Sequence, residues 1–324
     1  MVSVEFVFAT VNILFKMVLD RGMNHLIIVA YRQLISSIFL TPLAYLWERE
    51  SWSKLTPCLM GQMFLCALLG LTLCQYFFLL GLKYTSTTFM CAFINMVPVI
   101  TFIIALPFGM EKANMKSKSG KAKVLGTLTC VGGALILMLY KGLPLITREP
   151  RPWPSTKAAG WGVIGSIYLC AGSLSWSSWF LIQTRVGNKY SFQYSSTAIM
   201  SMFSAIQSTI LCFIVDRNIS KWALKGKLEI LCILYAGIIA SGLCYVVMSW
   251  CVKQRGPVFT SAFSPLIQIF AAAFDVSILH QQIYLGSILG SIIVIVGMYV
   301  LLWGKSNNEE IGKQIVPTEM DETR

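Results

Sequence analysis

The chain has 324 residues, of which 56% are hydrophobic and 12% are charged, and its formal net charge is +12. Soluble domains carry about twice that share of charged side chains, so the composition excludes an ordinary soluble protein and indicates a polytopic membrane protein. The basic residues lie mostly in short breaks between apolar runs, as is typical of cytoplasmic loops. The positive charge therefore does not predict nucleic-acid binding.

Ten hydrophobic runs are long enough to cross a bilayer as helices, which takes about 20 apolar residues each. They lie at residues 2–19, 26–47, 58–81, 85–108, 124–143, 159–182, 191–215, 230–252, 257–279 and 283–303. We therefore expect an all-α membrane protein with ten transmembrane helices. The first run begins at Val2 without a basic leader or a small-residue cleavage site, so we expect it to remain as an anchor.

Two of these runs carry a proline near the middle. Pro98 lies in the fourth run, shortly after Asn95, and Pro265 lies in the ninth run within a similar order of residues. A proline frees a backbone carbonyl where no bulk water can reach it, so protein or an aqueous cavity must surround the break. We expect both spans to be broken helices that face the interior of the bundle.

The two halves of the chain repeat each other. Gly126 and Gly133 in the fifth run recur at the same spacing as Gly290 and Gly297 in the tenth. Each half holds five spans, an odd number, so the second copy must enter the membrane upside down. The glycines permit close helix packing and equally suit contact with a second copy, so a homodimer stays open.

This repeat predicts the domain organisation. The first repeat covers residues 1–143, a linker loop covers 144–158, and the second repeat covers 159–303. The segment 304–324 is rich in acidic residues and poor in apolar ones, and is predicted to be a disordered cytoplasmic tail.

Several motifs together resemble a known family. They include Ala30-Tyr-Arg32, Leu139-Tyr-Lys-Gly142, Ser175-Trp-Ser-Ser-Trp-Phe180 and Leu302-Trp-Gly-Lys305. Over nearly the whole chain they resemble the plant nodulin-like EamA transporters, also called UMAMIT or Walls-Are-Thin-related, of the drug/metabolite transporter superfamily. The resemblance implies ten helices in two EamA repeats and facilitated movement of amino acids or related metabolites, auxin among them in some members. Members usually carry a short hydrophilic leader, whereas Met1 here opens directly into the first span.

Charged and amide side chains inside the first two spans are candidates for contact with a cavity. Glu5, Asn12 and Lys16 share one face of the first span at helical spacing. Glu5 and Lys16 lie near its ends and are interpreted as snorkelling to the interfaces, as is Arg32 in the second span. Asn12 lies deeper and is the better candidate for a cavity.

Polar side chains also follow one face of each broken helix. With Asn12 and the two prolines they form the predicted substrate-binding set: Asn12, Thr88, Asn95, Pro98, Ser264, Pro265 and Gln268. Asp275, near the predicted outer end of the ninth span, is a candidate coupling residue. The alternative is that these groups form hydrogen bonds between helices. Trp176, Trp179 and Trp250 lie near predicted inner helix ends and fit an aromatic belt at the membrane surface at least as well as a binding site.

We predict a secondary or facilitative transporter that moves amino acids or related small metabolites, auxin included, by alternating access. The nearest alternative is a sugar-phosphate or nucleotide-sugar exchanger, which needs several cations deep in its cavity. A membrane protein without transport activity is a further alternative. An integral-membrane enzyme is disfavoured because the chain has two histidines and no paired acidic motif within a span.

The predicted partners are a small amino-acid-like solute and membrane lipids, and no cofactor, metal or catalytic residue is expected. If the amino terminus is cytoplasmic, the segments on the cytoplasmic side hold more Lys and Arg residues than the segments on the opposite side. This bias predicts that both termini are cytoplasmic. The plasma membrane is favoured over the vacuolar membrane.

Overall fold

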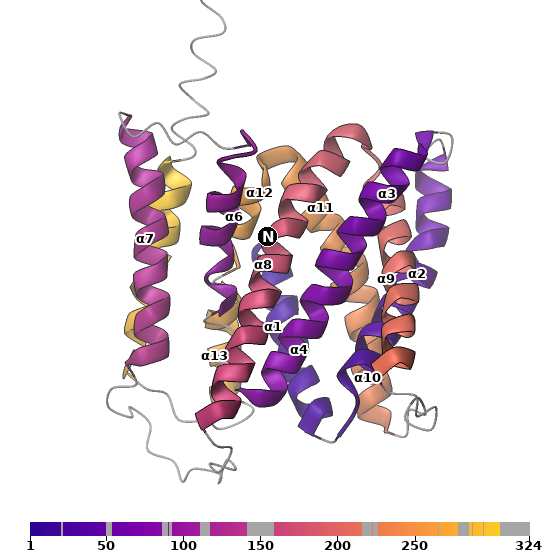
Figure 1. The fold of residues 1–324 in the computed structure, drawn as a ribbon, viewed down its shortest axis with the longest axis horizontal. Helices are drawn as coiled ribbons and strands as arrows, with labels where there is room; N and C mark the ends of the chain where they lie inside the picture. Colours follow the sequence, from indigo (N-terminus) through magenta and orange to yellow (C-terminus); the bar gives the residue numbers. More distant parts are fainter. Residues whose placement is uncertain are drawn as a thin grey trace, which may run out of the picture.

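The computed structural model describes residues 1–20, 22–49, 54–85, 90, 93–110, 117–140, 159–215, 222, 226–264, 266–277, 285–286, 288–293 and 295–304. The helices of this part run between the same two faces of the molecule (Figure 1). Five of them are long and apolar enough to cross a membrane: Val2–Leu19, His25–Trp47, Pro57–Tyr84, Gln193–Val215 and Lys227–Arg255. The predicted all-helical membrane architecture is confirmed.

Each half of the chain contributes five spans. The first half contains α1 (Val2–Asp20), α2 (His25–Trp47), the continuous helix α3 (Pro57–Cys66), η2 (Ala67–Leu73) and α4 (Cys74–Tyr84), then α6 (Val97–Ala105) and α7 (Lys118–Leu139). The second half contains α8 (Ala159–Lys189), α9 (Gln193–Val215), the continuous helix α10 (Lys227–Tyr235), η4 (Ala236–Cys244) and α11 (Tyr245–Arg255), then α12 (Pro257–Ser261), α13 (Leu266–Ser277) and a terminal helix at Ile288–Gly304. Residues 141–158 and 305–324, which hold the predicted linker and tail, lie outside the described part.

The fifth span begins earlier than predicted. Its helix starts at Lys118 rather than at residue 124, because the Ser117 hydroxyl accepts a hydrogen bond from Gly120 N at 2.9 Å and caps the helix. Capping side chains satisfy backbone donors that a helix end leaves open, and charge along the first turn does not prevent this. The apolar run alone therefore placed the boundary too late.

The third and eighth spans each contain a π-helical segment, which was not predicted. η2 and η4 end at the repeated pairs Leu73-Cys74 and Leu243-Cys244, so they occupy matching places in the two halves. Each presents a glycine to the opposite half. A Cβ on Gly70 would lie 2.0 Å from the Trp179 ring, so only a glycine fits there. Such π segments occur mostly near functional sites.

Both predicted breaks are present. In the fourth span a turn at Asn95 and Met96 precedes α6, and Pro98 is the second residue of that helix. In the ninth span a turn over 262–264 separates α12 from α13. A proline fits the first turn of a helix because the N–H that it lacks has no partner there. The chain thus restarts a helix at each break instead of bending one.

Side chains of α8 complete the hydrogen bonding of the first break. The Ser173 hydroxyl donates to Phe93 O at 3.0 Å, and the Ser177 hydroxyl donates to Val97 O at 3.2 Å. The two serines lie one helical turn apart, as do the two carbonyls that they meet. The broken helix is therefore held by the opposite half of the chain.

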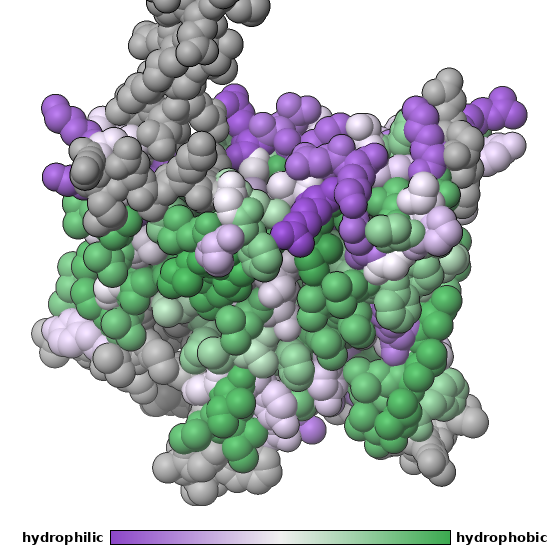
Figure 2. Space-filling view, turned by 45° about the horizontal axis from the view of Figure 1, so that its top comes forward, coloured by the Kyte–Doolittle hydropathy of each residue, from purple (hydrophilic) through white to green (hydrophobic). Residues whose placement is uncertain are grey.

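The outer surface of the bundle suits lipid. Large apolar side chains on helix flanks, such as Ile38, Leu128 and Ile214, are exposed. Figure 2 shows hydrophobic residues covering the flank and hydrophilic residues gathered at the top. Inside the bundle, hydroxyl groups pair across the halves, as Ser36 and Ser201 do at 3.1 Å. The chain is an integral, multi-pass membrane protein.

The predicted glycine packing joins α7 to the terminal helix. A Cβ on Gly126 would lie 2.5 Å from Leu301 N and 2.7 Å from Gly297 O. A Cβ on Gly297 would lie 2.6 Å from Cys130 N. These are backbone atoms that cannot rotate away, so both glycines are needed for two helix backbones of the same chain to meet.

Gly126→Ala should destabilise the protein by about 1–3 kcal/mol, as overpacking of an interior generally does. The measurement is the thermal unfolding midpoint of the purified protein in detergent. Gly132→Ala on the same helix is the matched control, because nothing lies within 4 Å of a Cβ at that position. Equal midpoints for the two variants would contradict the packing.

Candidate functional site

A cavity of about 60 Å³ lies inside the bundle, where helices of both halves meet. Its wall consists of Phe8, Asn12 and Phe15 from α1, Arg32 from α2, Cys74, Gln75, Phe78 and Leu79 from α4, Met90 and Ile94 from the first part of the fourth span, Trp176 from α8, Tyr245 from α11 and Ile267 from α13. The wall therefore borders both broken spans and both helices that contain a π segment.

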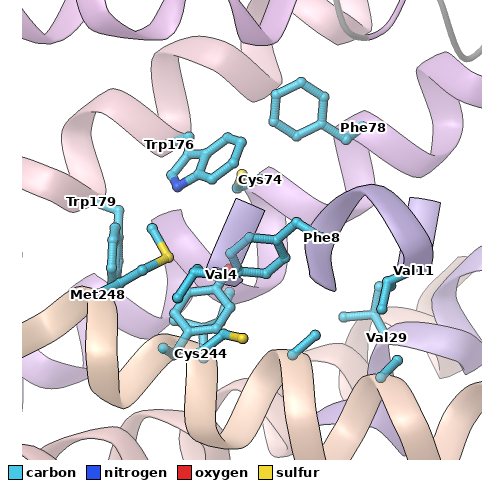
Figure 3. Close-up of a cluster of buried hydrophobic side chains, with 14 of the residues drawn as sticks. Val4, Phe8, Val11, Val29, Cys74, Phe78, Trp176, Trp179, Cys244 and Met248 are labelled. Carbon is cyan, nitrogen blue, oxygen red and sulfur yellow. The ribbon is translucent and has the colours of Figure 1, made fainter. Parts of the chain in front are cut away.

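Aromatic rings form much of this wall. The Phe8 ring lies edge-on to Trp176 and to Tyr245, with ring centroids 6.4 Å and 5.9 Å apart. The Phe78 ring meets Trp176 from another side at 5.8 Å. Figure 3 shows Phe8 projecting from α1 toward Trp176 and Cys74. Ring faces and edges of this kind bury the apolar or aromatic body of a small ligand.

The polar part of the wall is small and holds one cation. The Arg32 Nε donates a hydrogen bond to the Ser241 hydroxyl, and the guanidinium lies over the Phe15 ring, 5.5 Å from its centroid. Gln75 Nε2 donates to the Tyr245 hydroxyl at 3.3 Å. A few polar groups in an apolar pocket are typical of sites that orient a small molecule.

The three charged side chains that were interpreted as snorkelling groups are buried, so that interpretation was wrong. Glu5 is 1% exposed, Lys16 is 7% exposed and Arg32 is 6% exposed. The Lys16 ammonium donates to Leu82 O at 3.5 Å instead of reaching the surface. Contacts of α1 with α13 and η4, and of α2 with α9 and η4, cover the faces that carry these residues.

Of the described residues of the predicted substrate-binding set, one is part of the cavity wall. Asn12 lies in the cavity wall. Asn95 is buried in the turn directly after the wall residue Ile94, and Pro98 is buried in the first turn of α6. Ser264 is buried in the turn before α13, and its carbonyl accepts from Ile267 N at 3.1 Å. The binding roles of these residues stay predictions.

The other predicted residues are only partly described. Thr88 and Pro265 lie outside the described residues. Gln268 and Asp275 belong to α13, but their side chains also lie outside the described part.

Several wall residues were missed or misjudged from the sequence. Trp176 is buried in the wall and Trp179 in the core beside η2, so neither belongs to an aromatic belt. Tyr245 looks like an ordinary member of an apolar run. Gln75 is an amide within the predicted span 58–81, so it carried the same kind of signal as Asn12 and was overlooked. Arg32 did carry one, since an ionisable residue within a span is a functional candidate by default.

The arrangement can bind and orient a ligand. In the described part of the chain no group of three His, Cys, Asp or Glu side chains is placed to hold a metal ion. The described wall contains no carboxylate, and its cysteine is Cys74.

A fold of two inverted five-helix halves with a cavity between them defines a membrane transporter of the inverted-repeat class. The chain belongs to the EamA-like transporter family, which its sequence matches over residues 1–139 and 163–303. Membership of this family makes it a membrane transporter of small solutes. This family membership agrees with the motifs quoted above.

Known relatives cover almost the whole chain. WAT1-related protein At3g30340 of Arabidopsis thaliana is 48% identical over 93% of this chain and 85% of that protein. WAT1-related protein At4g01440 of the same plant is 49% identical over 94% of this chain and 85% of that protein. A solved crystal structure that is 15% identical covers 95% of this chain and 99% of its own, with a TM-score of 0.64, and shares the fold. The chain is therefore a plant WAT1-related type of EamA transporter.

Two natural cysteines on one continuous helix test whether water reaches the cavity. Cys74 lines the wall, whereas Cys66 is fully buried and its thiol lies 3.5 Å from Gln183 Oε1. N-ethylmaleimide should therefore modify Cys74 and leave Cys66 unmodified in the folded protein, as read by peptide mass spectrometry. The exposed Cys58 serves as the positive control. Modification of Cys66 ahead of Cys74 would contradict the position of the cavity.

Proposed function

We propose that the chain moves amino acids or related small metabolites, auxin included, by secondary or facilitative alternating access. The observation that supports this most is the cavity, which lies between the two inverted halves and combines aromatic faces with a few polar groups. Secondary transporters built from inverted repeats bind their solute at such an interface near the midplane. We propose residues 1–143 and 159–303 as the two rocking units.

Contacts between the halves support a rocking mechanism. At one face the Glu48 carboxylate accepts from Ser195 N at 2.7 Å and from Tyr194 N at 3.2 Å, which joins the end of α2 to the start of α9. At the opposite face the Tyr31 hydroxyl donates to Trp222 O at 3.0 Å. Both ends are thus bridged across the halves. Opening toward either side requires one of these two sets of hydrogen bonds to break.

The charge of the wall argues against the sugar-phosphate alternative. A phosphoryl group carries up to two negative charges and is generally bound by several cations or a helix terminus. Among the described wall residues Arg32 is the cation. One guanidinium suits one carboxylate better than a phosphate.

Transport itself is tested with purified protein in proteoliposomes loaded with a mixed pool of labelled amino acids, with labelled auxin as a second substrate. We expect saturable efflux that an empty-liposome control lacks. Asn12→Leu removes a polar group from the wall, so the apparent affinity should fall by about two- to tenfold, as for a lost hydrogen bond. Asn95→Leu and Gln268→Leu test the broken helices in the same assay.

The outcomes separate the possibilities. A weaker apparent affinity in Asn12→Leu, with the affinity unchanged in Asn95→Leu and Gln268→Leu, would support a solute site at the cavity rather than at the breaks. No efflux of amino acids or auxin from the intact chain, at a reconstitution verified by orientation and amount, would leave the family assignment standing and remove the proposed substrates.

We propose that both termini lie in the cytoplasm, with the plasma membrane favoured over the vacuolar membrane. The described basic side chains are more numerous at the face where α7 begins and α11 ends than at the face where α4 ends and α10 begins. Basic residues are retained on the cytoplasmic side.

Two exposed positions at opposite faces test this orientation. Lys227→Cys at the start of α10 should react with a membrane-impermeant maleimide in intact cells, and Lys118→Cys at the start of α7 should react only after permeabilisation. The unmodified chain under the same conditions gives the background from the natural cysteines. The reverse pattern would invert the proposed topology.

A further inference from the structure

Arg32 holds a permanent positive charge well inside the membrane-spanning part of the protein. It is the eighth residue of α2, so its Cα lies about 10 Å from the start of that helix at 1.5 Å per residue. A buried guanidinium in a span is costly unless it faces a cavity or a partner. Arg32 faces the cavity described above.

Contacts within the protein use only part of the hydrogen-bonding capacity of the Arg32 guanidinium. Nε donates to the Ser241 hydroxyl on η4, and one face of the group lies over the Phe15 ring. A guanidinium has five N–H donors. In the described residues no carboxylate pairs with Arg32, and the side-chain hydrogen bond that it makes there is the one from Nε. Arg32 is one of the residues that line the cavity.

We propose that Arg32 is the anion-binding group of the transporter and receives the carboxylate of the solute, an inference that rests on the proposed function. Ser241 and Phe15 fix the plane of the guanidinium, which leaves the two terminal nitrogens for a paired contact with both carboxylate oxygens. Guanidinium and carboxylate match in this geometry, and Lys does not reproduce it. Arg32 therefore selects ligands by charge.

The wall residues other than Arg32 indicate what the ligand carries besides its carboxylate. Phe8, Phe78 and Trp176 offer apolar surface for a flat or branched body, and Gln75 and Tyr245 offer polar atoms beside it. The described wall carries no acidic group that would hold an ammonium by an ion pair. Aromatic faces bind an ammonium only weakly by comparison with a carboxylate. The ligand class is thus a small monocarboxylate with an apolar or aromatic body, with or without an amino group.

Three probes with the same phenyl ring test this class: phenylacetate, phenylalanine and phenethylamine. Binding to the full-length protein in detergent is measured by isothermal titration calorimetry. Phenylacetate and phenylalanine should bind, and phenethylamine should bind at least about tenfold more weakly, since it lacks the charged group that Arg32 pairs with. Phenethylamine that binds as tightly as phenylacetate overturns the proposal without any variant.

Substitutions of Arg32 test its role in carboxylate binding. Arg32→Gln should weaken phenylacetate binding by about tenfold or more, and Arg32→Lys should recover part of the loss because it restores charge without the planar fork. Arg185→Gln is the matched control, since Arg185 is exposed outside the cavity, over the Phe108 ring. Unchanged binding in a folded Arg32→Gln overturns the proposal. If that variant does not fold, Arg32→Lys and the comparison of the three probes decide.

The same proteins in proteoliposomes distinguish this inference from the proposed function. Carboxylate binding that depends on Arg32, without any flux, supports the anion site and rejects transport of these probes. Flux that persists in Arg32→Gln with unchanged apparent affinity supports transport and rejects Arg32 as the anion site. Failure of both carboxylates to bind the intact chain rejects the site.

Discussion

The structure depends on one constraint: in the interior of a bilayer, every backbone polar group must find its partner within the protein. Continuous helices meet it by themselves, but the two broken spans do not. Ser173 and Ser177 of α8 supply donors to carbonyls at the first break. At the second break the turn satisfies itself, with Ser264 N donating to Ser261 O at 3.0 Å. The first break therefore has to lie inside the bundle, against α8.

This requirement also positions the cavity. Broken helices and π segments pack less regularly than plain α-helices, because their side chains leave the ridges that neighbouring helices fill. In this protein the two kinds of irregularity occur in both halves and meet around one space. In its wall, Gln75 Oε1 is a buried acceptor without a hydrogen-bond partner among the described residues. A site of this kind binds a solute with both halves at once, which is what alternating access needs.

The sequence predicted features that depend on local interactions better than features that depend on contacts between distant parts of the chain. Pro98 and its counterpart in the second half indicated both breaks, because proline acts on its own backbone. Asn12 was correctly expected to be deep in the bundle, and it lies in the wall. Arg32 was misread, since its distance from the helix end permitted either snorkelling or burial. Only the neighbouring helices α9 and η4 determine which of the two occurs.

The sequence by itself determined the class of fold: apolar runs of spanning length, an odd number of spans in each repeat, and the family motifs leave one architecture. These signals are local or periodic, so they survive without knowledge of contacts. Tertiary structure alone decided that Gln75, Trp176 and Tyr245 share a wall, that η2 and η4 are π-helical, and that Arg32 faces the cavity. Those facts arise from packing between residues far apart in the chain, which no single run of the sequence contains.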